Sequence, residues 1–357
     1  MRILAVIPVM DVGGAEVVTA TLALAARDAG HDVVLASAGG FRADAVGEAG
    51  VAHMSVRLAS RAPMDLVSSA RTLRSSVRSS RTHLVHAHNV KASLVARAAV
   101  GRRVPILTTV HGVPADQVAT AVRILKWSSR QVVAVSPYVA EQLEAHGFPA
   151  QRITVIENAT EAVAGHPRRE ARTRLGIAPG QSVALCPARL VDQKRHDLLL
   201  EAWGALEGDD AVLLLAGDGP NRQRIEADVQ ALGLGDRVRV LGARDDVDWL
   251  LAAADLLVLP TDWEGLPISL LEAMGAGVPV VVSRVGGVVE TLGEAVRLVE
   301  PNSAEALREG IADLLEDTKR RAAQVERAQR LVEERFGVPG MVAQYERLYE
   351  EMVGEGA

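Results

Sequence analysis

LPTDWEGLPISLLEAMGAGVPVVVSRVGGVVE, at residues 259–290, is the stretch of this 357-residue sequence that decides its fold. A short apolar run at residues 255–259 leads into it and ends at a proline, as a buried parallel strand does. Apolar residues then recur at helical spacing across residues 268–274, after Pro267 at a position where a first helical turn tolerates proline. Two glycines end the helix, and residues 278–282 read as a second buried strand. This alternation predicts an α/β unit with a parallel sheet.

Two glutamates bracket the start of the predicted helix. Glu264 lies in the loop before the helix, and Glu272 lies eight residues later on the helix itself. Free backbone N–H groups and the helix dipole favour an anion at a helix N-terminus. Both carboxylates can therefore face a phosphate-bearing ligand that lies across the helix start. Gly286 and Gly287 are expected to begin the next loop and to allow close approach of the backbone.

These motifs resemble the donor-site signature of family 4 glycosyltransferases, which are retaining, nucleotide-sugar-dependent enzymes of the GT-B fold. The resemblance rests on the E-x7-E pair, the EGLP loop, the LLEAMGAGVPVV run and the GG-x-x-E that follows. It implies that Glu272 accepts the ribose hydroxyls and that Glu264 positions the sugar. The remaining donor-binding residues that it implies here are Gly265, Leu266, Pro267, Ile268 and Ser269. An ordinary strand–helix–strand unit without a ligand is the alternative.

Length and charge limit the classes of protein to which the chain can belong. Its 357 residues favour two domains, and with 48% hydrophobic but only 3% aromatic residues the cores must be filled by Val, Leu and Ala. Residues 1–165 hold 17 Lys or Arg and 12 Asp or Glu, whereas residues 166–357 hold 22 and 33. The basic first half suits an acidic acceptor or an anionic membrane surface, and an imbalance without function fits equally well.

The single cysteine and the N-terminal residues indicate the cellular compartment in which we expect the protein. Cys186 is the single cysteine, so it cannot form an internal disulfide and is expected to be a buried core thiol. Residues 1–10 carry a short apolar run that reads as a first strand and not as a signal peptide. No apolar segment reaches the roughly 20 residues that span a bilayer. We expect a cytoplasmic protein, or one that is peripheral at the inner membrane face.

A glycine turn follows the first predicted strand, residues 3–9. Gly13, Gly14 and Glu16 belong to this turn, which lies where α/β sheets meet phosphates. The turn resembles the acceptor-side loop of family 4 enzymes. That resemblance implies that the backbone of Gly14 approaches the donor phosphate across the cleft, with Gly13 and Glu16 on the acceptor side. A tight turn without a ligand is the alternative.

Three histidines follow strands of the first half. His86 and His88 point the same way from one strand, but zinc needs three or four ligands and no third ligand stands nearby, so we assign no metal. His111 follows the strand at residues 106–110 and is expected to face the cleft. The resemblance implies that His111 lies beside the transferred sugar, on the acceptor side, and a structural histidine is the alternative.

Cationic residues follow the strand at residues 183–186. The sequence there resembles the family's R-L-x-x-x-K motif, which implies that Arg189 and Lys194 hold the diphosphate, one as a planar fork and one as a point charge. Two cations can replace a metal by offsetting the leaving-group charge. By the same resemblance the loops of Gly217 and Arg244 contribute to the donor site, and the base lies against the second of them.

Asp246 and Asp248 spell the D-x-D motif that binds metal in the other large glycosyltransferase fold. Here they precede a predicted helix, where carboxylates favour the dipole, so we interpret them as a capping cluster and expect no metal. Residues 162–174 are rich in charge and contain Gly165 and Pro167, which favours a linker.

The predicted fold is therefore α/β, with two Rossmann-like domains that face a cleft, as in GT-B enzymes. We expect an N-terminal acceptor domain at residues 1–163 and a donor domain at residues 164–337. The glycine and proline residues at 337–340 are expected to break the helical region before a last helix. By resemblance this last helix, within residues 338–357, crosses back to the first domain.

A basic stripe marks the predicted helix at residues 65–80. Its apolar face carries Leu66, Ala70, Leu73 and Val77, and its separate basic stripe carries Arg71, Arg74 and Arg78, extended by Arg81. A basic stripe beside an apolar one can lie on an anionic membrane, which makes peripheral membrane contact one expected interaction. A solvated helix face is the alternative.

The resemblance thus implies retaining transfer of a hexose or N-acetylhexosamine from a nucleotide sugar to a hydroxyl acceptor. A UDP-sugar is favoured, GDP-mannose is the second choice, and the acceptor is a lipid-linked glycan or a small natural product. The catalytic residues are expected to be Glu264, His111, Arg189 and Lys194. Charge stabilisation of the departing diphosphate is the main expected effect. No cofactor and no nucleic-acid partner are expected, and an epimerase or a non-catalytic sugar-nucleotide-binding protein is the alternative.

Overall fold

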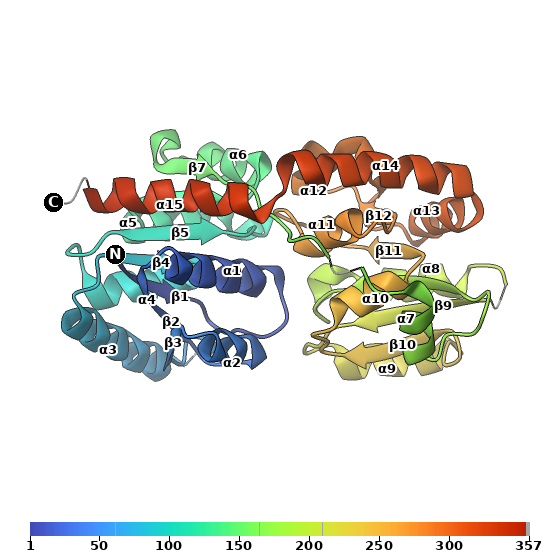
Figure 1. The fold of residues 1–357 in the computed structure, drawn as a ribbon, viewed down its shortest axis with the longest axis horizontal. Helices are drawn as coiled ribbons and strands as arrows, with labels where there is room; N and C mark the ends of the chain where they lie inside the picture. Colours follow the sequence, from blue (N-terminus) through green and yellow to red (C-terminus); the bar gives the residue numbers. More distant parts are fainter. Residues whose placement is uncertain (61, 164, 209, 355–357) are drawn as a thin grey trace. The chain divides into compact units, whose positions relative to one another are not determined.

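The computed structural model describes residues 1–60, 62–163, 165–208 and 210–354. It divides into two compact units (Figure 1). Unit 1 comprises Met1–Asn158 and Pro339–Ala357, and unit 2 comprises Ala159–Val338. Residue 164, at which the second domain was predicted to begin, lies outside the described residues.

Unit 1 is built on a parallel sheet whose seven described strands run in the order β3-β2-β1-β4-β5-β6-β7. Its strands are β1 (Arg2–Val6), β2 (Asp32–Ser37), β3 (Ala52–Ser55), β4 (Leu84–Ala87), β5 (Ile106–Val110), β6 (Gln131–Ala134) and β7 (Ile153–Val155). Its helices are α1 (Gly14–Asp28), α2 (Phe41–Glu48), α3 (Pro63–Ser80), α4 (Val90–Val100), α5 (Val118–Ser128), α6 (Pro137–Ala145) and most of α15 (Val338–Gly354).

Helices of unit 1 cover both faces of its sheet. The chain moves outward from β1 through β2 to β3, and in the other direction from β4 through β5 and β6 to β7. Right-handed crossovers in opposite directions place their helices on opposite faces. Accordingly α1 packs on α2, while α3, α4, α5 and α6 contact one another in sequence. The expected apolar face of α3 packs on the core: Leu73 is buried in a cluster shared with α4, β1 and β4, and Leu66, Ala70 and Val77 are partly buried against it.

The C-terminal helix α15 packs within unit 1, as predicted. Tyr349 Oη lies 2.9 Å from His86 Nδ1 on β4, and Tyr345 Oη lies 3.0 Å from Thr109 Oγ1 on β5. Both tyrosines are buried. The expected break at residues 337–340 is wrong in its position, because the helix already begins at Val338 and a proline is tolerated in a first helical turn.

Unit 2 is built on a second parallel sheet, whose six described strands run in the order β10-β9-β8-β11-β12-β13. Its strands are β8 (Ser182–Pro187), β9 (Ala211–Ala216), β10 (Val238–Gly242), β11 (Leu256–Leu259), β12 (Val280–Ser283) and β13 (Arg297–Val299). Its α-helices are α7 (Arg168–Arg174), α8 (His196–Gly204), α9 (Arg222–Ala231), α10 (Val247–Ala253), α11 (Ile268–Gly275), α12 (Gly286–Leu292), α13 (Ala304–Glu316) and α14 (Thr318–Arg335).

The predicted linker at residues 162–174 is only partly a connection. Its second half forms helix α7, which packs on α10. Arg168 and Arg172 both bind the carboxylate of Asp255, at 2.5 and 3.2 Å. Two of the charged residues that suggested a linker therefore form ion pairs within unit 2. The core prediction for Cys186 is confirmed, since its side chain is fully buried on β8.

Candidate functional site

The candidate site of unit 2 lies at the point in its sheet where the order of successive strands reverses. Strands β8 and β11 are neighbours at the centre, and the sheet continues through β9 on one side and through β12 on the other. Loops that leave the carboxyl ends of two such strands diverge and open a crevice, which is where α/β sheets bind ligands. Arg189 and Lys194 follow β8, and Glu264 follows β11. The topology therefore brings the predicted cationic loop and the first predicted carboxylate together.

Lys194 and Glu264 form a buried ion pair at this crevice. The Lys194 Nζ donates to Glu264 Oε1, and the exposed fractions of the two side chains are 12% and 9%. Thr261 Oγ1 donates to the same carboxylate oxygen at 2.9 Å. Because both charged groups are largely shielded from water, their attraction is screened less than that of a surface pair. The ammonium group is thus held at a fixed place beside the crevice.

Backbone and amide contacts fasten the two loops to each other. The Asp262 N–H donates to the Gln193 carbonyl at 2.9 Å, and Gln193 Nε2 donates to the Trp263 carbonyl at 2.7 Å. Thr261 Oγ1 lies 3.2 Å from the Gln193 carbonyl. Gln193 and Thr261 were not predicted as site residues. Their only signal in the sequence is their position next to Lys194 and within three residues of Glu264.

Arg189 differs from Lys194 because its side chain is exposed. Its guanidinium forms no hydrogen bond or ion pair with any residue that the structure describes. Its loop is nevertheless fixed, since the Leu190 N–H donates to the Asp218 carbonyl at 3.0 Å. The backbone of Gly217 packs directly against this loop, because a β-carbon at Gly217 would collide with the Ala188 carbonyl. The structure thus gives Gly217 a contact with the Arg189 loop, and Arg189 is available to an anion.

Helix α11 begins directly after the EGLP loop. Pro267 is its N-cap residue and offers no side-chain hydrogen bond, so no capping side chain competes for the first N–H groups. Glu272 is half-buried on this helix, one turn after Ile268. The expectation that Gly286 and Gly287 open a loop is wrong, because they are the first residues of helix α12.

Gly287 shows why glycine is needed at the start of α12. A β-carbon there would collide with the carbonyl oxygen of Gly265 and would come 2.8 Å from that of Glu264. The first turn of α12 therefore packs directly against the backbone of the EGLP loop. The predicted close approach of the backbone is present, but its partner is the protein's own loop.

The glycine turn of unit 1 follows strand β1. Gly13 is the N-cap residue of α1, and Gly14 is the first residue of the helix. Glu16 folds back over the turn, because a β-carbon on Gly13 would collide with its carboxylate. Its side chain is mostly buried, with an exposed fraction of 9%. The three predicted residues therefore lie together at the carboxyl edge of the sheet.

Three histidines form a column at the same edge of unit 1. The ring centroids of His86 and His88 are 4.0 Å apart, and those of His88 and His111 are 6.1 Å apart with the rings stacked. Burial lowers the pKa of His86 to about 3 and that of His111 to about 4, so both rings are neutral at pH 7. Neither ring nitrogen of His111 has a partner among the described residues.

His111 follows β5 as predicted, but its stacking on His88 was not foreseen from the sequence. It is a third imidazole beside the H-x-H pair, because β4 and β5 are neighbouring strands. Among the described residues, however, no three His, Cys, Asp or Glu side chains are grouped so that they could hold a metal ion. His111 is instead a neutral side chain with two nitrogens free to bind hydroxyl groups.

The D-x-D segment of unit 2 is occupied by internal ion pairs. Asp246 accepts two hydrogen bonds from Arg244, at 2.7 and 2.5 Å, and Asp248 lies 2.6 Å from His166 Nε2. Asp246 is the N-cap residue of α10 but forms no side-chain capping bond, so the prediction of capping by this carboxylate is wrong. The guanidinium of Arg244, expected near the base, faces Asp246 in the structure.

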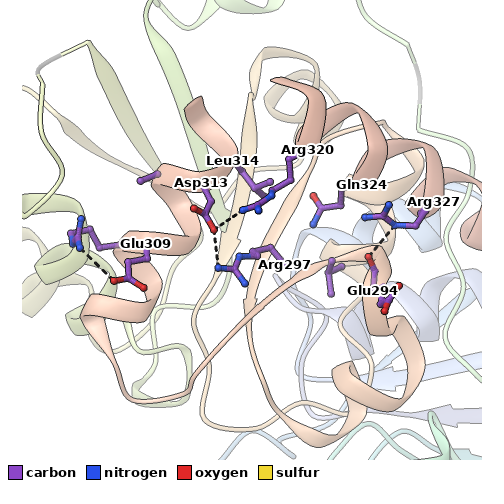
Figure 2. Close-up of a pocket in the computed structure, with 11 residues that line it drawn as sticks. Glu294, Arg297, Glu309, Asp313, Leu314, Arg320, Gln324 and Arg327 are labelled. Carbon is purple, nitrogen blue, oxygen red and sulfur yellow. Dashed lines mark hydrogen bonds and ion pairs between the residues drawn. The ribbon is translucent and has the colours of Figure 1, made fainter. Parts of the chain in front are cut away.

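A separate cavity of about 680 Å³ lies between α13, α14 and strand β13 (Figure 2). Its charged side chains are largely paired: Asp313 binds Arg297 at 2.8 Å and Arg320 at 3.0 Å. Gln324 bonds both backbone groups of Val280, the first residue of β12. The cavity thus lies near the amino ends of β12 and β13, whereas ligands of such sheets bind at the carboxyl ends.

No described helix has the length and apolar character that crossing a membrane requires.

Sequence comparisons assign both halves of the chain. Residues 12–162 match the family described as Glycosyltransferase Family 4, and residues 167–331 match Glycosyl transferases group 1. The chain is 30% identical to the N-acetyl-alpha-D-glucosaminyl L-malate synthase of Bacillus anthracis, over 75% of this chain and 73% of that protein. It is 32% identical to the 2-deoxystreptamine N-acetyl-D-glucosaminyltransferase of Streptomyces fradiae, over 57% and 51% of the two chains.

A solved structure shares the fold over nearly the whole length. The crystal structure of HepE from Anabaena in complex with UDP-glucose superposes with a TM-score of 0.87, at 23% identity, over 98% of this chain and all of that chain. This likeness covers both units, each of which is built on its own parallel sheet. The chain therefore belongs to the family 4 glycosyltransferases and has the GT-B fold.

Proposed function

We propose that this enzyme transfers a hexose or N-acetylhexosamine from a nucleotide sugar to a hydroxyl acceptor, with retention at the anomeric carbon. Unit 2 binds the donor, and unit 1 supplies the acceptor side through the glycine turn and His111. The observation that carries the proposal is the loop after β8, on which Lys194 is paired with Glu264 and the exposed Arg189 has no partner among the described residues.

The proposed reaction exchanges one bond for another on the same face of the sugar. The bond between the anomeric carbon and the phosphate oxygen breaks, and the acceptor oxygen forms a bond to that carbon. The acceptor proton passes to the departing phosphate. Arg189, Lys194 and the first N–H groups of α11 stabilise the negative charge that develops on the diphosphate, which is usually a large part of catalysis.

The two glutamates have different proposed roles. Glu272, one turn along α11 from the phosphate position, accepts hydrogen bonds from the ribose hydroxyls. Glu264 lies in the loop ahead of the helix, holds the Lys194 ammonium and contacts the sugar. His111, neutral because burial lowers its pKa to about 4, positions a sugar hydroxyl with a free ring nitrogen.

The cations of the crevice support transfer without a metal. Lys194 and Arg189 supply two positive charges where a diphosphate would carry its charge. The D-x-D carboxylates, which bind metal in the other large fold, already bind Arg244 and His166. We therefore propose that activity persists in EDTA. Loss of turnover in chelator, with recovery in Mn²⁺ or Mg²⁺, would contradict this part of the proposal.

A UDP-sugar is the proposed donor. The two relatives described above are named for transfer of N-acetylglucosamine, and HepE was solved with UDP-glucose. These names support a uridine nucleotide and an N-acetylhexosamine or hexose. The same two names contain L-malate, a carboxylic acid, and 2-deoxystreptamine, an aminocyclitol. They therefore support a small-molecule acceptor as much as a lipid-linked one.

A panel of UDP-glucose, UDP-N-acetylglucosamine and GDP-mannose tests the donor. A bound donor at 100 times its Kd should add about 2.7 kcal/mol to the stability of the enzyme, which raises its melting temperature. The donor that protects is then incubated with candidate acceptors, and the anomeric coupling in the product is measured by NMR. Inversion would contradict retention, and conversion of the donor to an epimer without acceptor would favour the epimerase.

A further inference from the structure

The helical layer formed by α3, α4 and α5 concentrates positive charge. Residues 57–130, which include these helices, hold thirteen Lys or Arg and two Asp or Glu, although the whole chain has a net charge of −6. Neither α4 nor α5 contains an acidic residue, and α3 contains only Asp65. Asp65 is already bound by Arg57 at 3.2 Å. The solvent side of this layer is therefore strongly cationic.

The same layer carries exposed apolar side chains. Met64 and Val67 on α3 are 84% and 49% exposed, Leu94 on α4 is 37% exposed, and Trp127 on α5 is 54% exposed. Single exposed apolar residues are ordinary on soluble proteins. Here four of them lie on three helices that pack in sequence, among the cations just described.

On α3 the apolar and basic residues form one stripe. Met64, Val67, Arg71, Arg74 and Arg78 follow one another at steps of three or four residues, so they share one side of the helix. All five are exposed.

The opposite flank of α3 faces strand β3. There Ser69 Oγ accepts from the backbone N–H of Arg57, which follows β3, and Asp65 binds the side chain of the same arginine. The stripe from Met64 to Arg78 therefore lies on the flank turned away from β3, the flank on which α4 packs.

On α5 the tryptophan lies on the outer side of the helix. Lys126 lies beside Gly147, just after α6, because a β-carbon on that glycine would come 3.5 Å from Lys126 Nζ. Lys126 thus marks the flank of α5 that faces α6. Ser128 marks the flank that faces α4, because it contacts Ser93 and Arg97. Trp127 lies about 100° from each of these two markers and is exposed, so it is on the outer side of α5. The stripe of α3, Leu94 of α4 and Trp127 of α5 therefore all lie on the solvent side of one helical layer.

We propose that this area, the α3–α5 surface, docks the enzyme on an anionic lipid bilayer. It is defined by Met64, Val67, Arg71, Arg74, Arg78 and Trp127. The arginines bind lipid phosphates, and the apolar side chains enter the interfacial region, for which tryptophan has a marked preference. Nucleic acid also binds arginines, but the backbone of a duplex offers no partner for exposed methionine and valine. The combination of cations with apolar side chains therefore favours a bilayer.

Docking of this kind concerns a surface of unit 1 and not the transfer reaction. Vesicle binding can therefore be measured whether or not the proposed function holds. Where both hold, the acceptor is met at the membrane, which selects the lipid-linked class of acceptor over the small-molecule class.

The test is co-sedimentation of the full chain with two kinds of vesicle, phosphatidylcholine alone and phosphatidylcholine with one quarter phosphatidylglycerol. We expect binding to the anionic vesicles only, with loss of binding between about 0.05 M and about 0.5 M salt, because salt screens exposed charges. Arg74→Glu/Arg78→Glu should weaken partitioning at least about tenfold. The matched control is Arg327→Glu/Arg330→Glu, which makes the same change of net charge on exposed residues of α14 and should bind as wild type.

Insertion of the apolar side chains has its own readout. Trp127 is the only tryptophan of unit 1, so a blue shift of fluorescence on vesicle binding should be lost in Trp127→Phe while sedimentation is largely kept. Equal binding of wild type to both kinds of vesicle, or equal loss in the two arginine double variants, would overturn the proposal. Binding to duplex DNA without binding to anionic vesicles would overturn it as well.

Discussion

Replacement of Lys194 by methionine should destabilise unit 2 as well as stop catalysis. The Lys194–Glu264 pair is 12% and 9% exposed, so removing the ammonium leaves a carboxylate with little access to water. Breaking a buried pair by removing one partner costs roughly 3–5 kcal/mol. Glu264 keeps the hydrogen bond from Thr261 Oγ1, which favours the lower end, about 3 kcal/mol. Glu264→Gln should likewise destabilise unit 2, because it leaves the ammonium unpaired.

The double variant Lys194→Met/Glu264→Gln should recover most of the lost stability. Replacing both members of a buried pair by neutral groups of similar size is often close to neutral, so we expect it within about 1 kcal/mol of wild type. It should remain as inactive as Lys194→Met, because the positive charge at the diphosphate position is still absent. Stability and catalysis therefore separate in the double variant and fall together in the single one.

Urea unfolding followed by tryptophan fluorescence measures these changes. Three of the four tryptophans, Trp203, Trp249 and Trp263, belong to unit 2, so the signal reports mainly on that unit. A cost below about 1 kcal/mol for Lys194→Met, or a double variant that loses the sum of both single costs, would refute the buried-pair interpretation.

Three further predictions use other parts of the structure. Arg189→Ala should lower kcat/KM by about 10²–10³ with unchanged unfolding, because the guanidinium is exposed and has no partner in the described part of the chain; near-normal kinetics would remove it from the site. His86 has a pKa of about 3 in the folded state and about 6.5 in the unfolded state. Below pH 6.5 the unfolded state therefore binds more protons, and the free energy of unfolding decreases as the pH is lowered, by about 2 kcal/mol at pH 5 for this group. Melting of His86→Gln at pH 7 and pH 5 should show a smaller loss than wild type, and an equal loss would contradict the assignment. Gly287→Ala should displace the EGLP loop and weaken donor binding in calorimetry, whereas Gly340→Ala, which meets no neighbour, should bind normally; normal binding by both would be evidence against the packing of α12 on Gly265.

Local sequence patterns were sufficient for the buried elements around the donor site. The apolar run before Pro260, the helical spacing after Pro267 and the following valine run became β11, α11 and β12 with small shifts at their ends. Such elements depend on periodicity and on glycine or proline at their ends, which a single sequence shows directly. The prediction was wrong for helix α7, which is held by contacts with residues distant in the sequence. Helix α7 was assigned to a linker because its arginines find their carboxylate, Asp255, more than eighty residues away.

The site itself could be predicted in part. The resemblance indicated Lys194 and Glu264, but no spacing rule pairs two residues that lie 70 positions apart. Their contact depends on β8 and β11 being neighbours, a matter of strand order that periodicity does not reveal. The column of His86, His88 and His111 has the same origin, since β4 and β5 are adjacent. Gly286 and Gly287 were assigned to a loop that allows close approach of the backbone, whereas they begin helix α12, in which packing on Gly265 requires glycine at position 287.

Calorimetric titration of UDP into wild type, Glu272→Ala and Glu264→Gln tests most directly whether unit 2 binds the nucleotide in the proposed orientation. A carboxylate that accepts from ribose hydroxyls contributes roughly 1.5–3 kcal/mol per hydrogen bond, so Glu272→Ala should raise the Kd of UDP by at least about tenfold. Glu264→Gln should not raise the Kd more than about threefold, because this residue contacts the sugar, which UDP lacks, and the ammonium of Lys194 that it leaves unpaired can still bind the diphosphate. A larger loss of UDP affinity in Glu264→Gln than in Glu272→Ala would contradict the proposed donor site.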